Sequence, residues 1–407
     1  MRVYFGVCGI GLGHVGRCIP IARKLHLRGD SVFFSTYRDA IPFVQREGFP
    51  LGRAPPIGFV VKPDGSVDFR KTTADPGPFS LLIVLKQIIA EIKFMKLFKP
   101  DIVVSDSRLS TLIAAKLLSI PSLTILNLYR VSIPRKTRFL NLSQIADGAI
   151  LTILGKMWEL GERILIPDLP SPYTLSTNNL TIPSTRMDKF RLIGTMLSKL
   201  PQDLPDNDEL HHMLKIDKNK SLIFAPISGS EQEKAPLIDL LLKILPQLPQ
   251  KYQIVMSLGD PNTSFIPVNN GNLIIYDWLP TRFEFLKLSD IVICKGGLGT
   301  ISQAIAYGKP LVIIPTPNHT EQINNAKRAE DLGVAKMLHQ EELNLDNLLS
   351  YVEELLLDEA YVKNVREISK DISNIDAVKT AIDIITNYAN NKLCSRSFLK
   401  EYRIGFS

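Results

Sequence analysis

Apolar runs and amphipathic stretches alternate along the first 130 residues of the chain. Residues 2–8 form a short apolar run typical of a buried strand, and residues 15–28 carry the apolar spacing of a helix. The alternation continues through further predicted helices and strands, at 31–35 (strand), 80–98 (helix), 102–104 (strand), 109–118 (helix) and 122–126 (strand). Strands that alternate with helices predict a parallel sheet with helices on both faces.

A second alternating series follows a loop-like stretch. Residues 166–185 combine several prolines with Ser, Thr and Asn, a composition typical of irregular structure. Beyond it, five short apolar runs predict strands at 222–225, 253–257, 273–276, 291–294 and 311–314. The chain is therefore expected to be an α/β protein with two Rossmann-like domains and a cleft between them.

The length of 407 residues favours two domains over one. We expect an N-terminal domain over residues 1–193 and a C-terminal domain over 194–376, followed by a helix and tail over 377–407 that packs back on the N-terminal domain. Charged residues make up 22% of the chain and hydrophobic ones 45%, the balance of a soluble globular protein. The four cysteines form no CxxC pair, which argues against a zinc ribbon or disulfide scaffold and suits a reducing compartment.

The start of the chain and its charge bear on location and partners. The chain opens on a strand-like run instead of a secretory signal, and no uncharged apolar stretch approaches about 18 residues, so we expect no transmembrane helix. The net charge of +7 fits a phosphorylated substrate, an anionic membrane face, nucleic acid or simply a mildly basic proteome. The basic residues are dispersed and lack an aromatic platform, so nucleic acid is not an expected partner.

A glycine-rich turn, GIGLGH at residues 9–14, joins the first predicted strand to the first predicted helix. Glycines let the backbone approach a ligand closely, and the helix start that follows favours an anion. The spacing departs from GxGxxG, and no acidic residue ends a strand about 20 residues later, so the dinucleotide fingerprint is not met. The alternative interpretation is a tight structural turn followed by a surface histidine.

Similar turns lie in the second half of the chain. The segment KGGLGTISQ at residues 295–303 follows a predicted strand and opens a helix, so its amides and hydroxyls can hold phosphate oxygens. It lacks the GxxxxGK[ST] pattern of P-loop NTPases. The segment ISGS at 227–230 and the polar segment at 319–325 also follow predicted strands, and ligands bind at the carboxyl ends of strands in open α/β sheets. Each could equally be ordinary turn or helix-start chemistry.

Together these motifs resemble the GT-B glycosyltransferases. The likeness is strongest over residues 2–17 and 273–335, where the DWLP, GKP and EQ segments follow the superfamily pattern. Within the superfamily, the chain resembles the bacterial MurG-type N-acetylglucosaminyltransferases and the eukaryotic two-subunit enzyme that adds the second GlcNAc to dolichyl-diphosphate-GlcNAc. The opening GxGxGH with Gly16-Arg17 looks like an archaeal N-glycosylation relative of those enzymes.

The resemblance implies a role for each matching position. Leu279 belongs to the loop that would hold uracil, and His14 matches the glycine loop that faces the donor and acceptor diphosphates. Gln303 stands where the MurG-like pattern has a ribose-binding Glu. Glu321 departs from the Gln-Gln pair that reads the donor sugar, whereas Gln322 keeps it. The diphosphate would be held by the glycine turns and their hydroxyls: Gly11, Gly13, Ser228, Gly229, Ser230, Gly297, Gly299 and Thr300.

The resemblance also implies the reaction. We expect inverting transfer of GlcNAc from UDP-GlcNAc to a lipid-diphosphate-linked GlcNAc, which forms β-1,4 chitobiose for N-glycan precursors without metal or cofactor. His14 is the candidate base because an imidazole has a suitable pKa, and its rival role is to orient a diphosphate. Asp106 follows a short strand and either lines the cleft or caps the next helix.

Other functions remain open at this level. They are transfer to a small lipophilic or diacylglycerol acceptor, 2-epimerisation of UDP-GlcNAc, and a nucleotide-sugar-binding role that needs a partner subunit. The presence of both halves in one chain weakens the last. A homo-oligomer is also left open.

The predicted helix at 80–98 has two distinct faces. One stripe is apolar and suits the core: Leu81, Val84, Ile88, Ile92 and Met95. The other face mixes lysines with aliphatic side chains: Leu82, Lys86, Ile89, Lys93 and Lys96. Such a face favours shallow contact with anionic lipid, which fits a cytoplasmic enzyme on the inner face of the cell membrane. The alternative is a surface helix whose lysine stems cover apolar neighbours.

Overall fold

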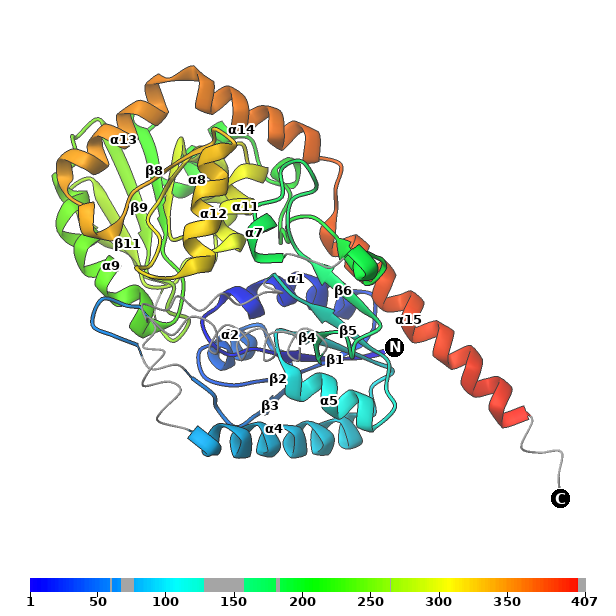
Figure 1. The fold of residues 1–407 in the computed structure, drawn as a ribbon. Helices are drawn as coiled ribbons and strands as arrows, with labels where there is room; N and C mark the ends of the chain where they lie inside the picture. Colours follow the sequence, from blue (N-terminus) through cyan, green and yellow to red (C-terminus); the bar gives the residue numbers. More distant parts are fainter. Residues whose placement is uncertain (59–60, 67–76, 128–156, 181–183, 264, 402–407) are drawn as a thin grey trace.

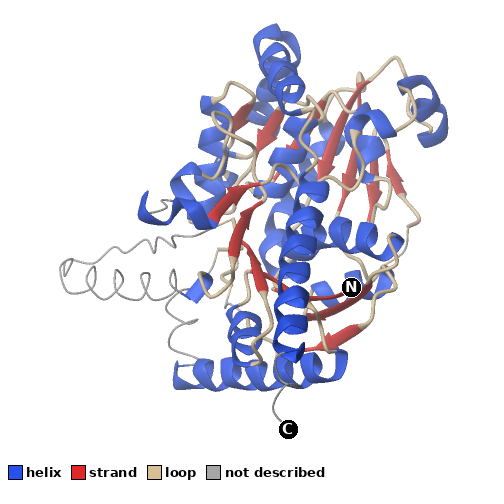
Figure 2. Cartoon of the chain, turned by 90° about the vertical axis from the view of Figure 1, so that its right-hand side faces the viewer, coloured by secondary structure: helices blue, strands red, loops and turns tan. Residues whose placement is uncertain are grey.

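The computed structural model describes the chain apart from residues 59–60, 67–76, 128–156, 181–183, 264 and 402–407. Two α/β domains are stacked on each other (Figure 1), and helices cover both faces of each sheet (Figure 2). The predicted architecture of two Rossmann-like α/β domains is thereby confirmed. None of the helices in the described part of the chain combines the length and apolar character needed to cross a membrane.

The N-terminal sheet is parallel throughout, with the order β3-β2-β1-β4-β5-β6-β7. Its strands are β1 (Arg2–Val7), β2 (Ser31–Thr36), β3 (Leu51–Arg53), β4 (Ile102–Asp106), β5 (Ser122–Ile125), β6 (Arg163–Ile166) and β7 (Phe190–Leu192). Its central strands are continuous apolar runs because both of their faces are covered by helices. The strand order reverses between β1 and β4, and in such sheets this switch point is where ligands bind.

Among the described residues, the helices between these strands are α1 (Gly13–Leu27), α2 (Ala40–Arg46), α4 (Gly77–Phe98) and α5 (Leu109–Leu117). A short helix, α7 (Thr177–Leu180), lies in the proline-rich stretch. The lysine-rich face of α4 is exposed as expected, with Ile89 68% exposed. Its buried face is less apolar than expected, since Gln87 and Glu91 are buried together with Met95.

The C-terminal sheet has the order β10-β11-β9-β8-β12-β13-β14, and only its edge strand β10 is antiparallel to its neighbour among the described pairs. Its strands are β8 (Ser221–Pro226), β9 (Tyr252–Ser257), β10 (Val268–Asn270), β11 (Leu273–Tyr276), β12 (Ile291–Cys294), β13 (Leu311–Ile313) and β14 (Ala335–Met337). Its helices are α8 (Asn207–Leu214), α9 (Glu231–Ile244), α10 (Arg282–Leu288), α11 (Leu298–Ala306), α12 (Thr320–Asp331), α13 (Leu345–Leu357) and α14 (Glu359–Ile372). The switch point here lies between β8 and β12.

The last helix, α15 (Ala377–Glu401), returns to the N-terminal domain and packs against α1 (Figure 1). Ala381 and Ile385 are fully buried in the same apolar cluster as Val15 and Ile19 of α1. The chain therefore crosses between the domains twice, once in the segment after β7 and once between α14 and α15.

Candidate active site

The N-terminal half of the site lies at the switch point between β1 and β4. The glycine turn that follows β1 leads into α1, which presents His14, and β4 ends at Asp106. The Nδ1 atom of His14 lies 2.8 Å from Oδ1 of Asp106. Arg17, one turn further along α1, binds the same carboxylate through Nε and Nη2, each at 2.5 Å. Asp106 thus ties the start of α1 to the end of β4.

The tautomer of His14 decides which role it can play. Nη2 of Arg17 lies 3.0 Å from Nδ1 of His14, but a guanidinium only donates and a carboxylate only accepts. Since Arg17 already has Asp106 as an acceptor, we assign the imidazole proton to Nδ1, where it is donated to Asp106. The Nε2 lone pair is then free to accept a proton, which is what a general base requires.

Asp106 is ionised at neutral pH despite its complete burial. Burial alone would raise its pKa, but the charge and hydrogen bonds of Arg17 and His14 outweigh it and hold the pKa at about 2. The alternative in which Asp106 caps the next helix is not observed, because Arg108 occupies that cap position and no side chain caps α5 there. Asp106 is therefore part of the site.

The glycine turn of the N-terminal domain meets the ISGS turn of the C-terminal domain. Gly11 has a φ of +66°, which L side chains rarely adopt, and its amide donates to Asp39 at 2.8 Å. A Cβ atom at Gly11 would lie 3.3 Å from the backbone of Gly229 and Ser230. The two domains therefore approach each other closely at the turns that the sequence singled out.

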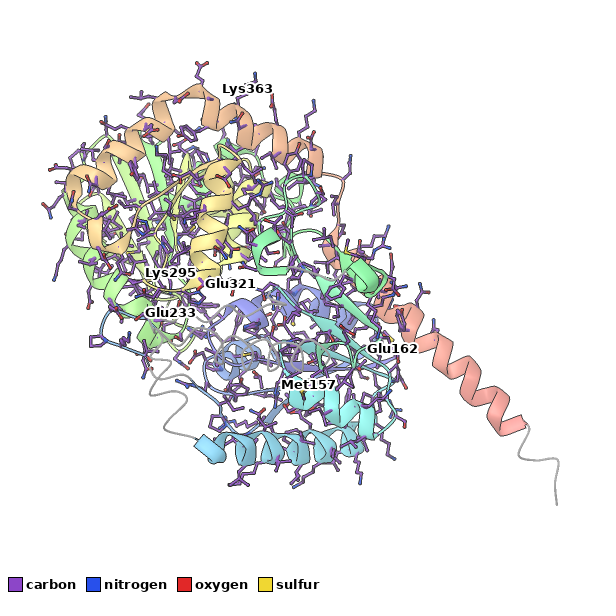
Figure 3. The ribbon with its side chains drawn as sticks, viewed as in Figure 1. Met157, Glu162, Glu233, Lys295, Glu321 and Lys363 are labelled. Carbon is purple, nitrogen blue, oxygen red and sulfur yellow. The ribbon has the colours of Figure 1, made fainter. Side chains whose placement is uncertain are left out.

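The C-terminal half of the site lies at the switch point between β8 and β12. Lys295 directly follows β12, is 5% exposed and places Nζ 2.7 Å from Oε1 of Glu233 on α9. The same oxygen accepts from Nε2 of Gln322 at 2.7 Å and from the hydroxyl of Thr316 at 3.1 Å. Figure 3 shows Glu233, Lys295 and Glu321 at the edge of the C-terminal domain that faces the N-terminal domain.

Burial and pairing act in opposite directions on this ion pair. Burial lowers the pKa of Lys295, although the carboxylate of Glu233 partly restores it. For Glu233, burial would raise the pKa, but Lys295 and then His319 more than offset this, so its pKa lies below the usual value. The ion pair with Glu233 places Lys295 as a buried cation beside the glycine turns.

The space in front of α11 is open. Cβ atoms at Gly297 or Gly299 would meet no heavy atom within 4 Å, and the same holds for Gly13 of the other domain. Gly297 is the N-cap of α11 and provides no side-chain cap, so the first amides of the helix are available to an anion. The nearby hydroxyl-bearing residues of the predicted set are all half-buried: Ser228, Ser230 and Thr300.

Several predicted donor-binding residues have other partners in this structure. Gln303 uses both ends of its amide, accepting from Arg282 and donating to the carbonyl of Met196 at 2.9 Å. The side chain of Leu279 lies in the core of the C-terminal domain, so only its backbone can contact a base. Glu321 accepts from Asn127 at 2.6 Å and so bridges the two domains.

Gln322, the remaining residue of the predicted sugar-binding pair, is held by the ion pair. Gln322 is buried, and its amide both donates to Glu233 and accepts from the Thr316 amide at 2.9 Å. Among the described residues, no group of three or more His, Cys, Asp or Glu side chains is arranged to hold a metal ion. Arg135, Lys136 and Arg138, basic residues whose apolar neighbours in the sequence also suggest membrane contact, lie outside the described part of the chain.

Sequence reasoning did not assign roles to Arg17, Lys295 or Glu233. Lys295 could have been found from its place between a buried strand and a glycine turn, where a cation would face an anionic ligand. Glu233 gives no such signal, because its contact with Lys295 spans 62 residues and depends on the packing of α9 beside β12.

Comparison with known proteins agrees with this arrangement. The family model described as the glycosyltransferase family 28 C-terminal domain matches residues 227–381. This part of the chain is therefore similar to the C-terminal domains of family 28 glycosyltransferases. It contains the whole C-terminal half of the site described above, from the ISGS turn to Gln322.

Relatives extend the likeness to the whole chain. An uncharacterized glycosyltransferase of Methanosarcina mazei is 26% identical over 398 residues, which cover 97% of this chain and 100% of that protein. A second relative, from Bacillus cereus, is 28% identical over 183 residues, which cover 42% of this chain and 49% of that protein. It is named UDP-N-acetylglucosamine–N-acetylmuramyl-(pentapeptide) pyrophosphoryl-undecaprenol N-acetylglucosamine transferase 1. The chain is thus similar over nearly its whole length to an archaeal glycosyltransferase, and over less than half of its length to a bacterial N-acetylglucosamine transferase.

Solved structures share the fold at low identity. The crystal structure of MurG from Acinetobacter baumannii aligns with a TM-score of 0.57 at 19% identity, covering 95% of this chain and 99% of that one. The spinosyn rhamnosyltransferase SpnG aligns with a TM-score of 0.66 at 16% identity, covering 94% and 100%. These likenesses establish the GT-B fold. The resemblance to the eukaryotic two-subunit enzyme stays a prediction.

Proposed function

We propose that this protein transfers GlcNAc from UDP-GlcNAc, with inversion, to a lipid-diphosphate-linked GlcNAc, forming a β-1,4-linked chitobiose. The Bacillus cereus relative is named as an N-acetylglucosamine transferase that acts on a pyrophosphoryl-undecaprenol acceptor, which supports both substrate classes. So does the presence of anion-favouring turns in both domains. We propose that this product serves the assembly of N-glycan precursors.

One observation carries the proposal. The turn that bears Gly11 lies against the turn that bears Gly229 and Ser230, so each domain brings its switch point to the same cleft. One turn is followed by His14 and the other lies beside Lys295. A donor diphosphate on the C-terminal side and an acceptor on the N-terminal side would then meet next to the imidazole of His14, which is hydrogen-bonded to Asp106.

The chemical step follows from the His14–Asp106 pair. The acceptor hydroxyl attacks the anomeric carbon, and its proton passes to Nε2 of His14. The bond between the anomeric carbon and the β-phosphate oxygen breaks, and UDP leaves with the electron pair. The buried carboxylate of Asp106 holds the ring through Nδ1 and stabilises the imidazolium that forms.

The negative charge on the departing UDP needs a partner in the site. The free amides at the start of α11 and the ammonium of Lys295 supply positive charge there, beside Gly229. These groups can do without a metal what a divalent cation does in other transferases. We therefore propose that the reaction needs neither metal nor cofactor.

A lipid-linked acceptor requires access to a membrane. The outer face of α4 carries exposed aliphatic side chains, among them Leu82 and Ile89, between exposed lysines at 86, 93 and 96. Lysines next to exposed aliphatics favour shallow binding to anionic lipid. We propose that the protein is cytoplasmic and binds the inner face of the cell membrane through α4.

The decisive experiment is a transfer assay without added metal. Purified protein is incubated with UDP-GlcNAc and a synthetic GlcNAc-diphosphate-lipid, and products are identified by mass spectrometry. We expect the gain of one HexNAc, which His14→Ala abolishes and His26→Ala, on the exposed far end of α1, leaves intact. Stereochemistry is read by NMR. No product from a folded protein that binds UDP would refute this acceptor and direct the search to small lipophilic acceptors. Epimer formation without acceptor would replace transfer by 2-epimerisation.

Membrane binding is tested separately by vesicle co-sedimentation. Vesicles with anionic lipid should retain the wild type, and the Ile89→Gln/Lys93→Gln variant should lose most of this binding. The matched control is Leu357→Gln/Lys363→Gln, an exposed apolar–basic pair on the opposite side of the molecule. Equal loss in both variants, or none in either, would contradict a role for α4.

A further inference from the structure

A second cavity lies away from the glycine turns, where the chain crosses between its domains. It has a volume of about 370 Å³ and is walled by the segment after β7, the turn between α11 and β13, and the end of α14 with the residues that follow it. We call it the hinge pocket. None of the glycine-turn residues, and neither His14 nor Lys295, lines it.

The charged lining of the hinge pocket is entirely basic. Lys309, Arg366 and Lys370 line it, and no acidic side chain does. None of these three side chains makes an ion pair or a hydrogen bond with any group that the structure describes. Three cations around one cavity, none of them in a close ion pair with a described carboxylate, attract an anion, since each lacks the compensation that ion pairing provides.

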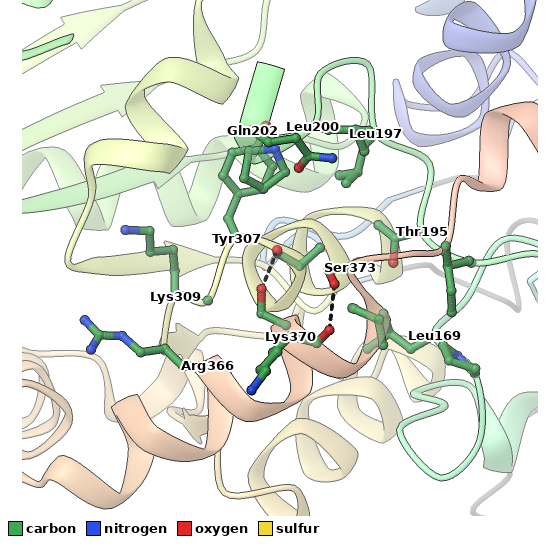
Figure 4. A pocket seen from close by; sticks show the side chains of 18 residues that line it. Leu169, Thr195, Leu197, Leu200, Gln202, Tyr307, Lys309, Arg366, Lys370 and Ser373 are labelled. Carbon is green, nitrogen blue, oxygen red and sulfur yellow. Dashed lines mark hydrogen bonds between the residues drawn. The ribbon is translucent and has the colours of Figure 1, made fainter. Parts of the chain in front are cut away.

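The remaining lining adds a hydroxyl and an apolar wall. Thr195 is only 8% exposed, and its Oγ1 has no hydrogen-bond partner among the described groups. A buried hydroxyl without a partner is costly, and an occupant with an acceptor atom would satisfy it. Figure 4 shows Lys309 and Arg366 extending to one side and Thr195 lying on the other, with Leu197 and Leu200 along the edge between them.

The surroundings of Lys309 favour an anion in the hinge pocket. Burial lowers its pKa to about 8, and the positive charges of Arg366 and Lys287 act in the same direction, whereas Asp290 opposes them. A bound anion would relieve this by stabilising the charged form. Lys309 therefore provides a cation whose environment in the free protein is unfavourable.

We propose that the hinge pocket binds a small organic phosphate with an apolar body. Its volume is at the lower end of the range of ligand sites, roughly 300–1,000 Å³. The cations fit a phosphate monoester, and the leucines fit a short hydrocarbon or ring. Because the walls come from both crossovers, an occupant touches both connections between the domains and is placed to affect how the cleft closes.

Hexyl phosphate is the probe, titrated into the full-length protein by isothermal titration calorimetry at pH 7. We expect saturable 1:1 binding that is at least tenfold tighter than binding of inorganic phosphate and that hexanol does not reproduce. Saturating UDP should not displace the probe, since UDP is expected at the glycine turns. This assay needs no transferase activity, so it is independent of the proposed reaction.

The variants separate the hinge pocket from general basicity. Arg366→Ala/Lys370→Ala removes two exposed cations of the pocket and should weaken hexyl phosphate binding at least tenfold. Lys363→Ala, on the same helix but outside the pocket, should bind as the wild type does (Figure 3). Absence of saturable binding, displacement by UDP, or equal affinity in both variants would overturn the proposal.

Discussion

Replacing Asp106 by Asn tests the arrangement of His14 directly. The substitution keeps the size of a fully buried side chain but removes the charge that binds Arg17 and His14. An amide that presents its NH₂ group to Arg17 faces a donor with a donor. The guanidinium of Arg17, whose side chain is 12% exposed, would then be a poorly compensated cation.

The magnitude follows from the shifted pKa. Asp106 has a pKa of about 2 instead of 3.8, which corresponds to roughly 2 kcal/mol of stability. Because the folded-state pKa is lowered, this stability is present above pH 3.8 and is lost as the pH falls toward 2. Breaking a buried pair costs about 3–5 kcal/mol, so we expect Asp106→Asn to unfold about 2–4 kcal/mol more easily at pH 7.

The effect on catalysis should be larger than the effect on stability. Without Asp106, the His14 ring loses its orientation and the preference for a proton on Nδ1. We expect kcat to fall by a factor on the order of 10²–10⁴ with little change in the dissociation constant of UDP. The assays are denaturant unfolding, steady-state kinetics across pH, and UDP titration calorimetry.

Asp101→Asn serves as the matched control. Asp101 precedes the same strand β4 and pairs with Arg2 at the other end of it, so the control removes a carboxylate but leaves the cleft untouched. A folded Asp106→Asn protein with kcat within threefold of wild type, alongside an inactive His14→Ala protein, would refute the reasoning. His14 would then act without Asp106, for example by orienting a diphosphate.

Three further predictions concern the turns and the hinge pocket. Gly11→Ala should lower the free energy of unfolding by about 1–2 kcal/mol, because φ at Gly11 is +66° and the new methyl group would meet the opposite turn. Gly13→Ala should be nearly neutral, and thermal unfolding of both variants checks this. Lys295→Met should weaken UDP binding about tenfold and raise the pKa of Glu233 by removing its ion-pair partner; calorimetry that gives an unchanged dissociation constant would contradict a role in donor binding. Hexyl phosphate binding should weaken as the pH rises through about 8, where Lys309 loses its proton, and Lys309→Met should abolish this dependence in titrations at pH 7 and 9.

The secondary structure that could be predicted is the part with strong local patterns. The expected strands at 2–8 and 253–257 became β1 and β9, because long buried runs are apolar on both faces. The strands β7 and β10 gave no such signal. They have three residues each and are half or fully exposed, so they are defined by pairing with a neighbouring strand and show no periodic pattern of apolar residues.

The candidate active site also has a part that local sequence predicts and a part that depends on distant contacts. The glycine turns were found because tight turns and helix starts impose local demands on residue type, as φ at Gly11 illustrates. The partnership of His14 with Asp106 was not predicted, since the two residues are 92 positions apart and meet only because β4 pairs with β1. For the same reason the sequence left Asp106 between two roles.

The sequence by itself determined the α/β class, the two-domain order and the backbone turns that face the cleft, because each depends on residues close together in the chain. The tertiary structure alone decided which charges meet: Asp106 with Arg17 and His14, and Lys295 with Glu233. It also decided that the three cations of the hinge pocket lie around one cavity without a close ion pair to any described carboxylate. Burial and pairing set the charge and proton affinity of these groups, and both arise only when distant segments pack together.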